Sequence, residues 1–427
     1  MASNPVPSPV QPADRIFSLD ALRGVAVLGI LIMNIQSFSE IGAAYMNPSA
    51  DGRITGVDYW IWFISHILAD QKFMAIFSML FGAGIVLFTS RAEARGRKPF
   101  PLFRRRSLWL LVFGLLHAYL LWSGDILVAY AICGLAVYKA RHWQPRTQLV
   151  VGLVLLAVTS GLLAGEGWSL KYWPSEAMTG MRQALWEPTS QQKAVEIAAY
   201  RGGWVGQMST RAQDSFGSEL QEFIFFTFWR VTGLMLAGMA LFKWRVLTAQ
   251  RSRAFYRNAF VLGLLFGIPL IIYGTQRDLA AHWSFTYSFF FGIQFNYWGS
   301  LGVALSWICL VMLLCQAPES KRLLVPLANT GRMAFSVYIL ETLLGTSIFY
   351  GGHGAGLFEK IDRPGQLLAV LAIWAIVIAF SQFWLHRFTM GPLEWLWRTL
   401  TYRHRIPLRK SSRPPLRDSS PSSAGVF

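Results

Sequence analysis

The sequence predicts an all-α fold, a polytopic membrane helix bundle of about ten transmembrane helices with both termini cytoplasmic. Of its 427 residues, 54% are hydrophobic and only 14% are charged. The apolar residues gather in runs near the length that a helix needs to cross a bilayer. Most of the 39 Lys and Arg residues fall between these runs, on one side. The net charge of +17 therefore reflects membrane topology, and we expect no nucleic acid as a partner.

The predicted spans follow one another along most of the chain. They cover residues 21–38, 73–88, 108–122, 126–138, 148–164, 223–242, 258–274, 294–315, 333–350 and 367–386. Basic residues concentrate in alternate connections, which the positive-inside rule assigns to the cytoplasm. Because no convincing cleavage site follows the first apolar run, we expect that span to stay in the mature protein.

Composition divides the chain into five predicted segments. They are a disordered cytoplasmic N-terminus (1–14), an N-terminal helix bundle (15–164), an extracytoplasmic cap (165–222), a C-terminal helix bundle (223–410) and a disordered cytoplasmic tail (411–427). The cap contains spaced Trp and Tyr residues, which favour the outer interface of a membrane. The alternative is that these rings form a platform for a glycan or a lipid head group.

A charged pair, Asp20 and Arg23, stands at the start of the first span. Charges at a membrane boundary are costly enough to need a reason. On a helix the two side chains share a face, and Asn34 continues the same stripe. We interpret the pair as the inner gate of a polar track. The alternative is a capping and packing pair that fixes where the span begins.

The third and fourth predicted spans form a short hairpin. At 15 and 13 residues they reach only about 22 and 20 Å, against about 30 Å for a hydrocarbon core. We therefore expect the tip at 123–125 to be recessed. His117 and Asp125 lie eight residues apart in this hairpin, and a carboxylate could orient the imidazole as a general base. The alternative is a core histidine with its hydrogen bonds satisfied.

Other ionisable residues fall in or beside the spans. His66 and Asp70, four residues apart, form a second candidate pair if their segment is helical, and Lys72 follows at once. Arg230 and Glu341 stand at similar predicted depths, so we expect a salt bridge between them. The alternative is that both line a polar cavity.

The predicted cytoplasmic side carries a basic cluster, the three consecutive arginines Arg104, Arg105 and Arg106 together with Arg91, Arg95, Arg97 and Lys98. Guanidinium groups could hold the phosphates of a nucleotide-like molecule, although juxtamembrane arginines also fix topology and contact anionic lipids. The His, Cys and acidic residues lack metal-ligand spacing. We predict no bound metal and no resident cofactor.

Several motifs resemble those of the YeiB family, domain-of-unknown-function family 418. They are Leu19-Asp-Ala-Leu-Arg-Gly24, Leu80-Phe-Gly-Ala-Gly84, Gly124-Asp-Ile-Leu127 and Gly391-Pro-Leu-Glu-Trp-Leu-Trp-Arg398. The last run is the most specific because it is long and aromatic. Members of the family are bacterial inner-membrane proteins, largely of unknown function, so the resemblance implies a multi-pass protein of the bacterial inner (plasma) membrane.

The opening motif is also similar to that of transmembrane acyltransferases such as the lysosomal heparan N-acetyltransferases. These have an Asp-x-x-Arg-Gly start, an asparagine like Asn34 and an Asp-x-x-Phe stretch like Asp70-Gln-Lys-Phe73. The similarity implies transfer of an acyl group from cytosolic acyl-CoA to an extracytoplasmic acceptor. That group's active-site histidine precedes the Asp-x-x-Phe stretch by more residues than His66 does. No histidine stands near Trp60, so we nominate His117 as the base.

The first functional hypothesis is thus a membrane acyltransferase. Arg23 and the arginines at 104–106 would hold acyl-CoA as a co-substrate, and Asn34 would donate to the acyl carbonyl. His117, oriented by Asp125, would deprotonate the acceptor. Membrane lipids and an extracytoplasmic glycan or lipid acceptor are the expected partners.

The second hypothesis is a transporter or permeability factor with a polar pathway through the bundle. The residues that would line this pathway are Asp20, Asp70, Lys72, Arg230 and Glu341. A third hypothesis is an assembly or interaction protein that turns over no substrate.

Overall fold

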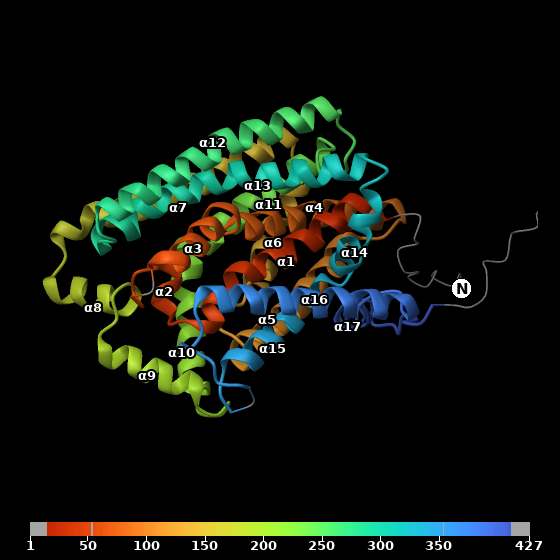
Figure 1. Cartoon of the computed structure of the whole chain (residues 1–427). Coiled ribbons are helices and arrows are strands. Elements are labelled where there is room, and N and C mark those ends of the chain that lie inside the picture. The colour runs from red at the N-terminus through yellow and green to blue at the C-terminus, as the bar shows by residue number, and fades with distance from the viewer. Residues whose placement is uncertain (1–14, 53, 353, 411–427) are drawn as a thin grey trace, which may run out of the picture.

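The computed structural model describes residues 15–52, 54–352 and 354–410, and helices dominate these ranges (Figure 1). Extended pairing among them is limited to one isolated bridge between Phe388 and Arg409. The predicted all-α class is therefore confirmed for the described part of the chain. The two ends predicted to be disordered, 1–14 and 411–427, lie outside it.

The first half of the described chain holds α1 (Phe17–Ser39), α2 (Gly42–Met46), α3 (Gly56–Leu68), α4 (Lys72–Ala94), α5 (Pro99–Leu120), α6 (Leu127–Ala136) and α7 (Pro145–Ser169). Three shorter helices follow, α8 (Ser175–Leu185), α9 (Ser190–Arg201) and α10 (Met208–Gly217). The second half holds α11 (Phe228–Lys243), α12 (Arg253–Ala280), α13 (Ile293–Gln316), α14 (Lys321–Arg332), α15 (Ala334–Phe349), α16 (Arg363–Arg387) and α17 (Pro392–Tyr402). Two π-helical stretches, Ser218–Thr227 and Phe285–Gly292, lead into α11 and α13.

Seven helical stretches of the described residues are long and apolar enough to cross a membrane. An eighth is added if α14 and α15, which meet at an angle of 81°, form one broken span. The chain is therefore a multi-pass membrane protein. This count is lower than the ten predicted spans, while the cytoplasmic placement of the termini stays a prediction from the charge distribution.

The difference in the span count lies in the short hairpin, which the structure forms from α5 and α6. Helix α5 has 22 residues and includes the three arginines at 104–106, so it is longer and more charged than the predicted span. Helix α6 has only 10 residues. The two helices pack closely, because a Cβ at Gly114 would lie 2.6 Å from the Val128 nitrogen.

Helix α1 runs through the middle of the bundle and packs against α4, α14, α15 and α16 (Figure 1). Glycines bring the backbones into direct contact, as small residues do between membrane helices. A Cβ at Gly24 would lie 1.9 Å from the Leu327 carbonyl oxygen, and one at Gly331 would lie 1.9 Å from the Asp20 carbonyl oxygen. Elements of the two predicted helix bundles are thus interleaved.

The predicted cap corresponds to α8, α9 and α10, at the end of the bundle opposite α17 (Figure 1). Arg211 and Trp204 both donate hydrogen bonds to the Leu120 carbonyl oxygen, at 2.8 and 3.0 Å. The cap therefore covers the end of α5. The aromatic rings of the predicted cap do not share one surface. Trp186 and Tyr200 are buried, whereas Trp168 and Tyr172 are exposed and the Lys171 ammonium lies over both of their rings.

Candidate functional site

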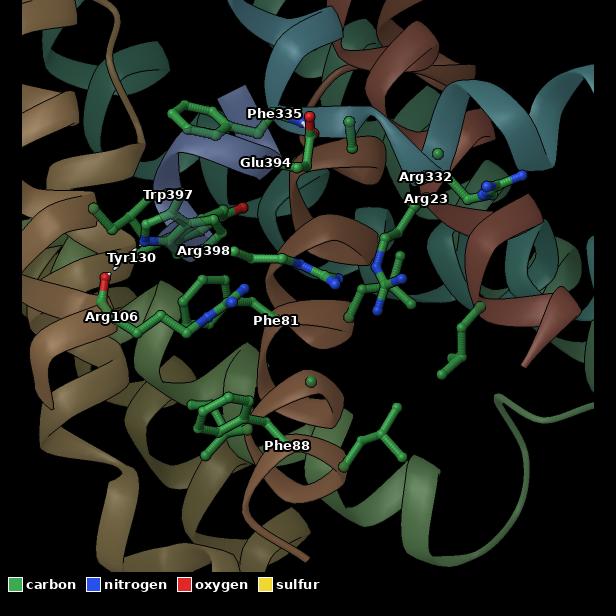
Figure 2. Close-up of a pocket in the computed structure, with 18 of the residues that line it drawn as sticks. Arg23, Phe81, Phe88, Arg106, Tyr130, Arg332, Phe335, Glu394, Trp397 and Arg398 are labelled. Carbon is green, nitrogen blue, oxygen red and sulfur yellow. Dashed lines mark hydrogen bonds between the residues drawn. The ribbon is translucent and has the colours of Figure 1, made fainter. Parts of the chain in front are cut away.

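A cavity of about 340 Å³ lies between α1, α4, α5, α6, α15 and α17 (Figure 2). Helix α4 lines the cavity for much of its length, from Phe77 to Ala92, and Arg95 continues the lining just after the helix ends. At 1.5 Å per residue, Phe77 and Arg91 are about 21 Å apart along this helix. The cavity is thus long, and its two ends differ in chemistry.

Arginines surround one end of the cavity. They are Arg15, Arg23, Arg91, Arg95, Arg97, Arg106, Arg332 and Arg398, and the acids that line the cavity with them are Asp20 and Glu394. Asp20 forms an ion pair with Arg23 at 2.8 Å. Figure 2 shows Arg23, Arg106 and Arg398 extending toward the same space. The excess of guanidinium groups makes this end suitable for an anion with several negative charges.

The aromatic motif Gly391–Arg398 contributes three residues to the wall of the cavity, Glu394, Trp397 and Arg398. Glu394 accepts hydrogen bonds from the backbone nitrogens of Phe335 and Ser336, at 2.8 and 3.2 Å, and so caps the start of α15. Trp397 donates to the Arg106 carbonyl oxygen at 2.8 Å, and its ring lies 3.6 Å from the Arg106 guanidinium carbon. These contacts fix α17 so that Arg398 reaches the cavity.

Burial perturbs two charged groups of α17. It raises the pKa of the Glu394 carboxyl and lowers the pKa of the Arg398 guanidinium, because both charged forms lose solvation. The guanidinium still carries its charge at neutral pH. A half-buried cation near other cations is stabilised by a bound anion, so the charged end favours anion binding.

The other end of the cavity is apolar except for two tyrosines. Val27, Ile30, Phe77, Ile126 and Leu127 contribute to its walls. Tyr130 shares a hydrogen bond with Ser78 at 3.1 Å and stacks with Phe77. Tyr338 ends the cavity on the side of the short hairpin, because its hydroxyl donates to the Gly124 carbonyl oxygen and its ring lies 5.0 Å from the His117 ring.

Behind Tyr338 lies the predicted pair of His117 and Asp125. The His117 Nδ1 and Asp125 Oδ1 are 2.8 Å apart, and both side chains are only 1% exposed. The other oxygen of Asp125 accepts from the Val128 nitrogen at 2.8 Å. The predicted contact between His117 and Asp125 is confirmed, whereas the role of His117 as a general base stays a prediction.

A third side chain completes this buried group. The Thr342 hydroxyl lies 3.0 Å from the His117 Nε2, so the imidazole is held at both nitrogens. Neither His117 nor Asp125 lines the cavity, from which Tyr338 separates them. Sequence reasoning missed Thr342 because a threonine inside an apolar helix gives no local signal.

The residues predicted to bind a donor are only partly brought together. Arg23 and Arg106 line the cavity, but Arg104 is exposed and Arg105 donates to the Thr401 carbonyl oxygen at 2.9 Å, outside it. Consecutive helical residues point about 100° apart, so one of the three arginines faces the cavity. Asn34 is half-buried on α1 and does not line the cavity, and its role toward an acyl carbonyl stays a prediction.

The second predicted pair, His66 and Asp70, belongs to a separate cluster with the buried Lys72 and Asn296. The His66 Nδ1 and Asp70 Oδ2 are 3.0 Å apart. Lys72 donates to the Asn296 Oδ1 at 2.5 Å, and the Asn296 amide donates to the Asp70 Oδ2 at 2.7 Å. These groups satisfy one another, and none of them lines the cavity.

The predicted salt bridge between Arg230 and Glu341 is wrong. Arg230 donates to the Ser300 hydroxyl at 2.9 Å and lies over the Tyr297 ring. Glu341 is 3% exposed, and its Oε1 has no hydrogen-bond partner among the described residues. Helix α11, which carries Arg230, packs against α4, α6 and α7, whereas α15 packs against α1, α16 and α17. Arg230 and Glu341 therefore lie on helices with different neighbours, although their predicted depths in the membrane are similar.

The predicted polar pathway is not lined by a single described cavity. Asp20 lines the cavity of Figure 2, but Asp70, Lys72, Arg230 and Glu341 do not. The described residues instead separate into the arginine-lined cavity, the cluster around Asn296 and the group around His117. The cavity is consequently the best candidate for a binding site.

Comparison with known proteins identifies the family of this chain. The family model described as "Protein of unknown function (DUF418)" matches residues 241–404, which include α15 and α17. The uncharacterized protein YeiB of Escherichia coli (strain K12) is 33% identical over 94% of this chain and 100% of its own length. The uncharacterized protein YxaH of Bacillus subtilis (strain 168) is 28% identical over 94% of this chain and 97% of its own.

A third relative is an uncharacterized 39.9 kDa protein of Bacillus acidopullulyticus, 29% identical over 94% of this chain and 97% of its own. Because these matches cover 94% of this chain, they extend well beyond residues 241–404 of the family model and take in α4, α5 and α6, which line the cavity. The resemblance predicted from the motifs is thus confirmed along nearly the whole chain. The chain belongs to the DUF418 family and is a homologue of the YeiB and YxaH proteins.

Proposed function

We propose that this protein is a membrane acyltransferase that passes an acyl group from cytosolic acyl-CoA to a hydroxyl or amine on the extracytoplasmic side. The observation that carries the proposal is the two-ended cavity. Its arginines suit the phosphates of CoA, and its apolar end approaches a buried His–Asp pair. We infer that the arginine end faces the cytoplasm of a bacterial inner membrane, because basic residues favour that side.

The length of the cavity supports this donor. Arg106 and His117 both belong to α5, and their separation along the helix axis is about 16 Å. A phosphate group at Arg106 and a thioester near His117 therefore require a long, flexible arm between them. Acyl-CoA has such an arm, whereas a nucleotide alone would leave the apolar end unfilled.

The buried group supplies the chemistry of transfer in this proposal. Asp125 holds the Nδ1 side of His117, and the Thr342 hydroxyl marks where an acceptor hydroxyl would sit at Nε2. His117 takes the acceptor proton while the acceptor oxygen attacks the thioester carbonyl carbon. The carbon–sulfur bond then breaks, and the CoA thiolate leaves and recovers the proton. The Tyr338 ring must move aside for the thioester to reach His117.

The direct test uses purified full-length protein in lipid nanodiscs, supplied with labelled acyl-CoA and either phospholipid or soluble glycan acceptors. We expect CoA to bind, and free CoA thiol to appear only together with labelled acceptor. The lipid and glycan arms identify the acceptor class. Absence of CoA binding, or binding without any transfer, would refute the acyltransferase.

Replacing Arg106 by glutamine should weaken CoA binding by about ten- to a hundredfold, because a charge-assisted hydrogen bond contributes roughly 1.5–3 kcal/mol. Isothermal titration of CoA into each variant measures this. Arg105→Gln is the matched control, since this neighbouring arginine bonds to Thr401 outside the cavity. Equal affinities of the two variants would contradict the assignment of the cavity as the donor site.

A further inference from the structure

Gly84 is a glycine of α4 that faces empty space inside the cavity. A Cβ added there would have no neighbour within 4 Å. Gly82, two residues earlier, shows the opposite situation, because its Cβ would lie 2.0 Å from the Met235 carbonyl oxygen of α11. Gly82 is therefore explained by helix packing, whereas Gly84 is not.

A glycine inside a helix destabilises it relative to alanine. Other helical glycines of the described chain, Gly161 among them, also face open space, so what sets Gly84 apart is its place in the wall of the cavity. The open space at Gly84 would accept the methyl group of alanine without any clash. A glycine often marks a place where a ligand approaches the backbone closely. The position of Gly84 within the cavity indicates which part of a ligand would pass close to the backbone there.

Gly84 lies midway between the two ends of the cavity. Three residues before it, the Phe81 ring lies 5.3 Å from the Tyr130 ring at the apolar end. Four residues after it, the Phe88 ring lies 5.6 Å from the Arg106 guanidinium carbon at the charged end. Because residues three and four apart share a helix face, Gly84 leaves a gap between two phenylalanines.

We propose that Gly84 is a specificity-determining residue whose missing side chain lets the pantetheine arm of acyl-CoA pass from the arginine end to the apolar end. This inference rests on the proposed acyl-CoA donor and adds the route of its arm along α4. The adenosine 3′,5′-bisphosphate portion of CoA stays at the arginines and does not reach Gly84. A larger residue at this position therefore blocks the arm and spares the head group.

The experiment measures the binding of CoA and of adenosine 3′,5′-bisphosphate, which lacks the arm, to full-length protein in nanodiscs. Gly84→Trp should raise the Kd of CoA by about ten- to a hundredfold, because forcing an extra ring into an occupied passage is costly. The Kd of the bisphosphate should stay within about twofold. Gly84→Leu should give an intermediate loss for CoA, and Gly84→Ala the smallest.

Gly161→Trp is the matched control, because Gly161 of α7 also has open space around its Cβ but lies outside the cavity. It should bind both probes like the wild type. An unchanged CoA affinity in both Gly84→Trp and Gly84→Leu, or an equal loss for both probes, would overturn the inference. If either of these results is found while the wild type binds CoA and transfers acyl groups, the route along Gly84 is refuted and the proposed function stands. If the wild type binds no CoA, the proposed donor fails, and the inference fails with it.

Discussion

Replacing His117 by glutamine should lower the rate of acyl transfer by about 10²–10⁴-fold, the usual contribution of a general base. Glutamine can still bond to Thr342 but cannot take up a proton from the acceptor. CoA should bind as tightly as to the wild type, because His117 does not line the cavity. The measurement pairs the rate of labelled product formation with the CoA titration, so that a loss of chemistry is separated from a loss of binding.

The chain offers a matched control for this variant in its second His–carboxylate pair. His66 lies 3.0 Å from Asp70, as part of the cluster around Asn296. If the chemistry belongs to the site beside the cavity, His66→Gln should retain most of the transfer rate. A His117→Gln protein with full activity would exclude this histidine as the base. Equal losses in the two variants would point to a shared effect on the fold.

Gly331→Val should strongly destabilise the folded protein, because α1 and α14 meet there backbone to backbone. Even a Cβ at Gly331 would lie 1.9 Å from the Asp20 carbonyl oxygen and 2.5 Å from the Gly24 nitrogen. Two backbones cannot rotate away as a side chain can, so the helices must separate. We expect the free energy of unfolding to fall by about 3 kcal/mol or more. A lower thermal midpoint and a smaller monodisperse fraction after extraction would report it.

Gly84→Ala is the control for the size of the added group, because its Cβ meets open space. It should leave the thermal midpoint unchanged or raise it, since alanine favours a helix by up to about 1 kcal/mol over glycine. An unchanged midpoint in Gly331→Val would mean that α1 and α14 are not packed as described. In that event, the placement of Asp20 and Arg23 at the cavity would also be wrong.

Contacts within a hairpin or within one helical turn could be predicted from the sequence. His66 lies in the last turn of α3 and Asp70 in the turn that follows it, so their spacing of four residues brings them together, and His117 and Asp125 are brought together by the turn between α5 and α6. Both contacts depend on segments close in sequence. The spacing rules did not extend to Arg230 and Glu341, which stand 111 positions apart on helices that have different neighbours.

The charged end of the cavity also depends on contacts between distant segments, which the sequence did not predict. Arg23, Arg106 and Arg398 come from helices far apart in the chain, and no local pattern links them. The run of three arginines at 104–106 correctly predicted a basic site. It did not show which of the three side chains faces the cavity. Only the packing of α5 on α17, fixed by Trp397, turns Arg106 toward the cavity.

The sequence by itself determined that this is a helical, multi-pass membrane protein of the DUF418 family, because apolar runs and long motifs are properties of the chain read in order. It also determined the local His–carboxylate pairs. Only the tertiary structure decided that arginines from α1, α5 and α17 surround one cavity, and that Tyr338 separates this cavity from His117. The physical reason is that helix packing joins residues by shape across long sequence separations, and no periodicity within one helix records its neighbours.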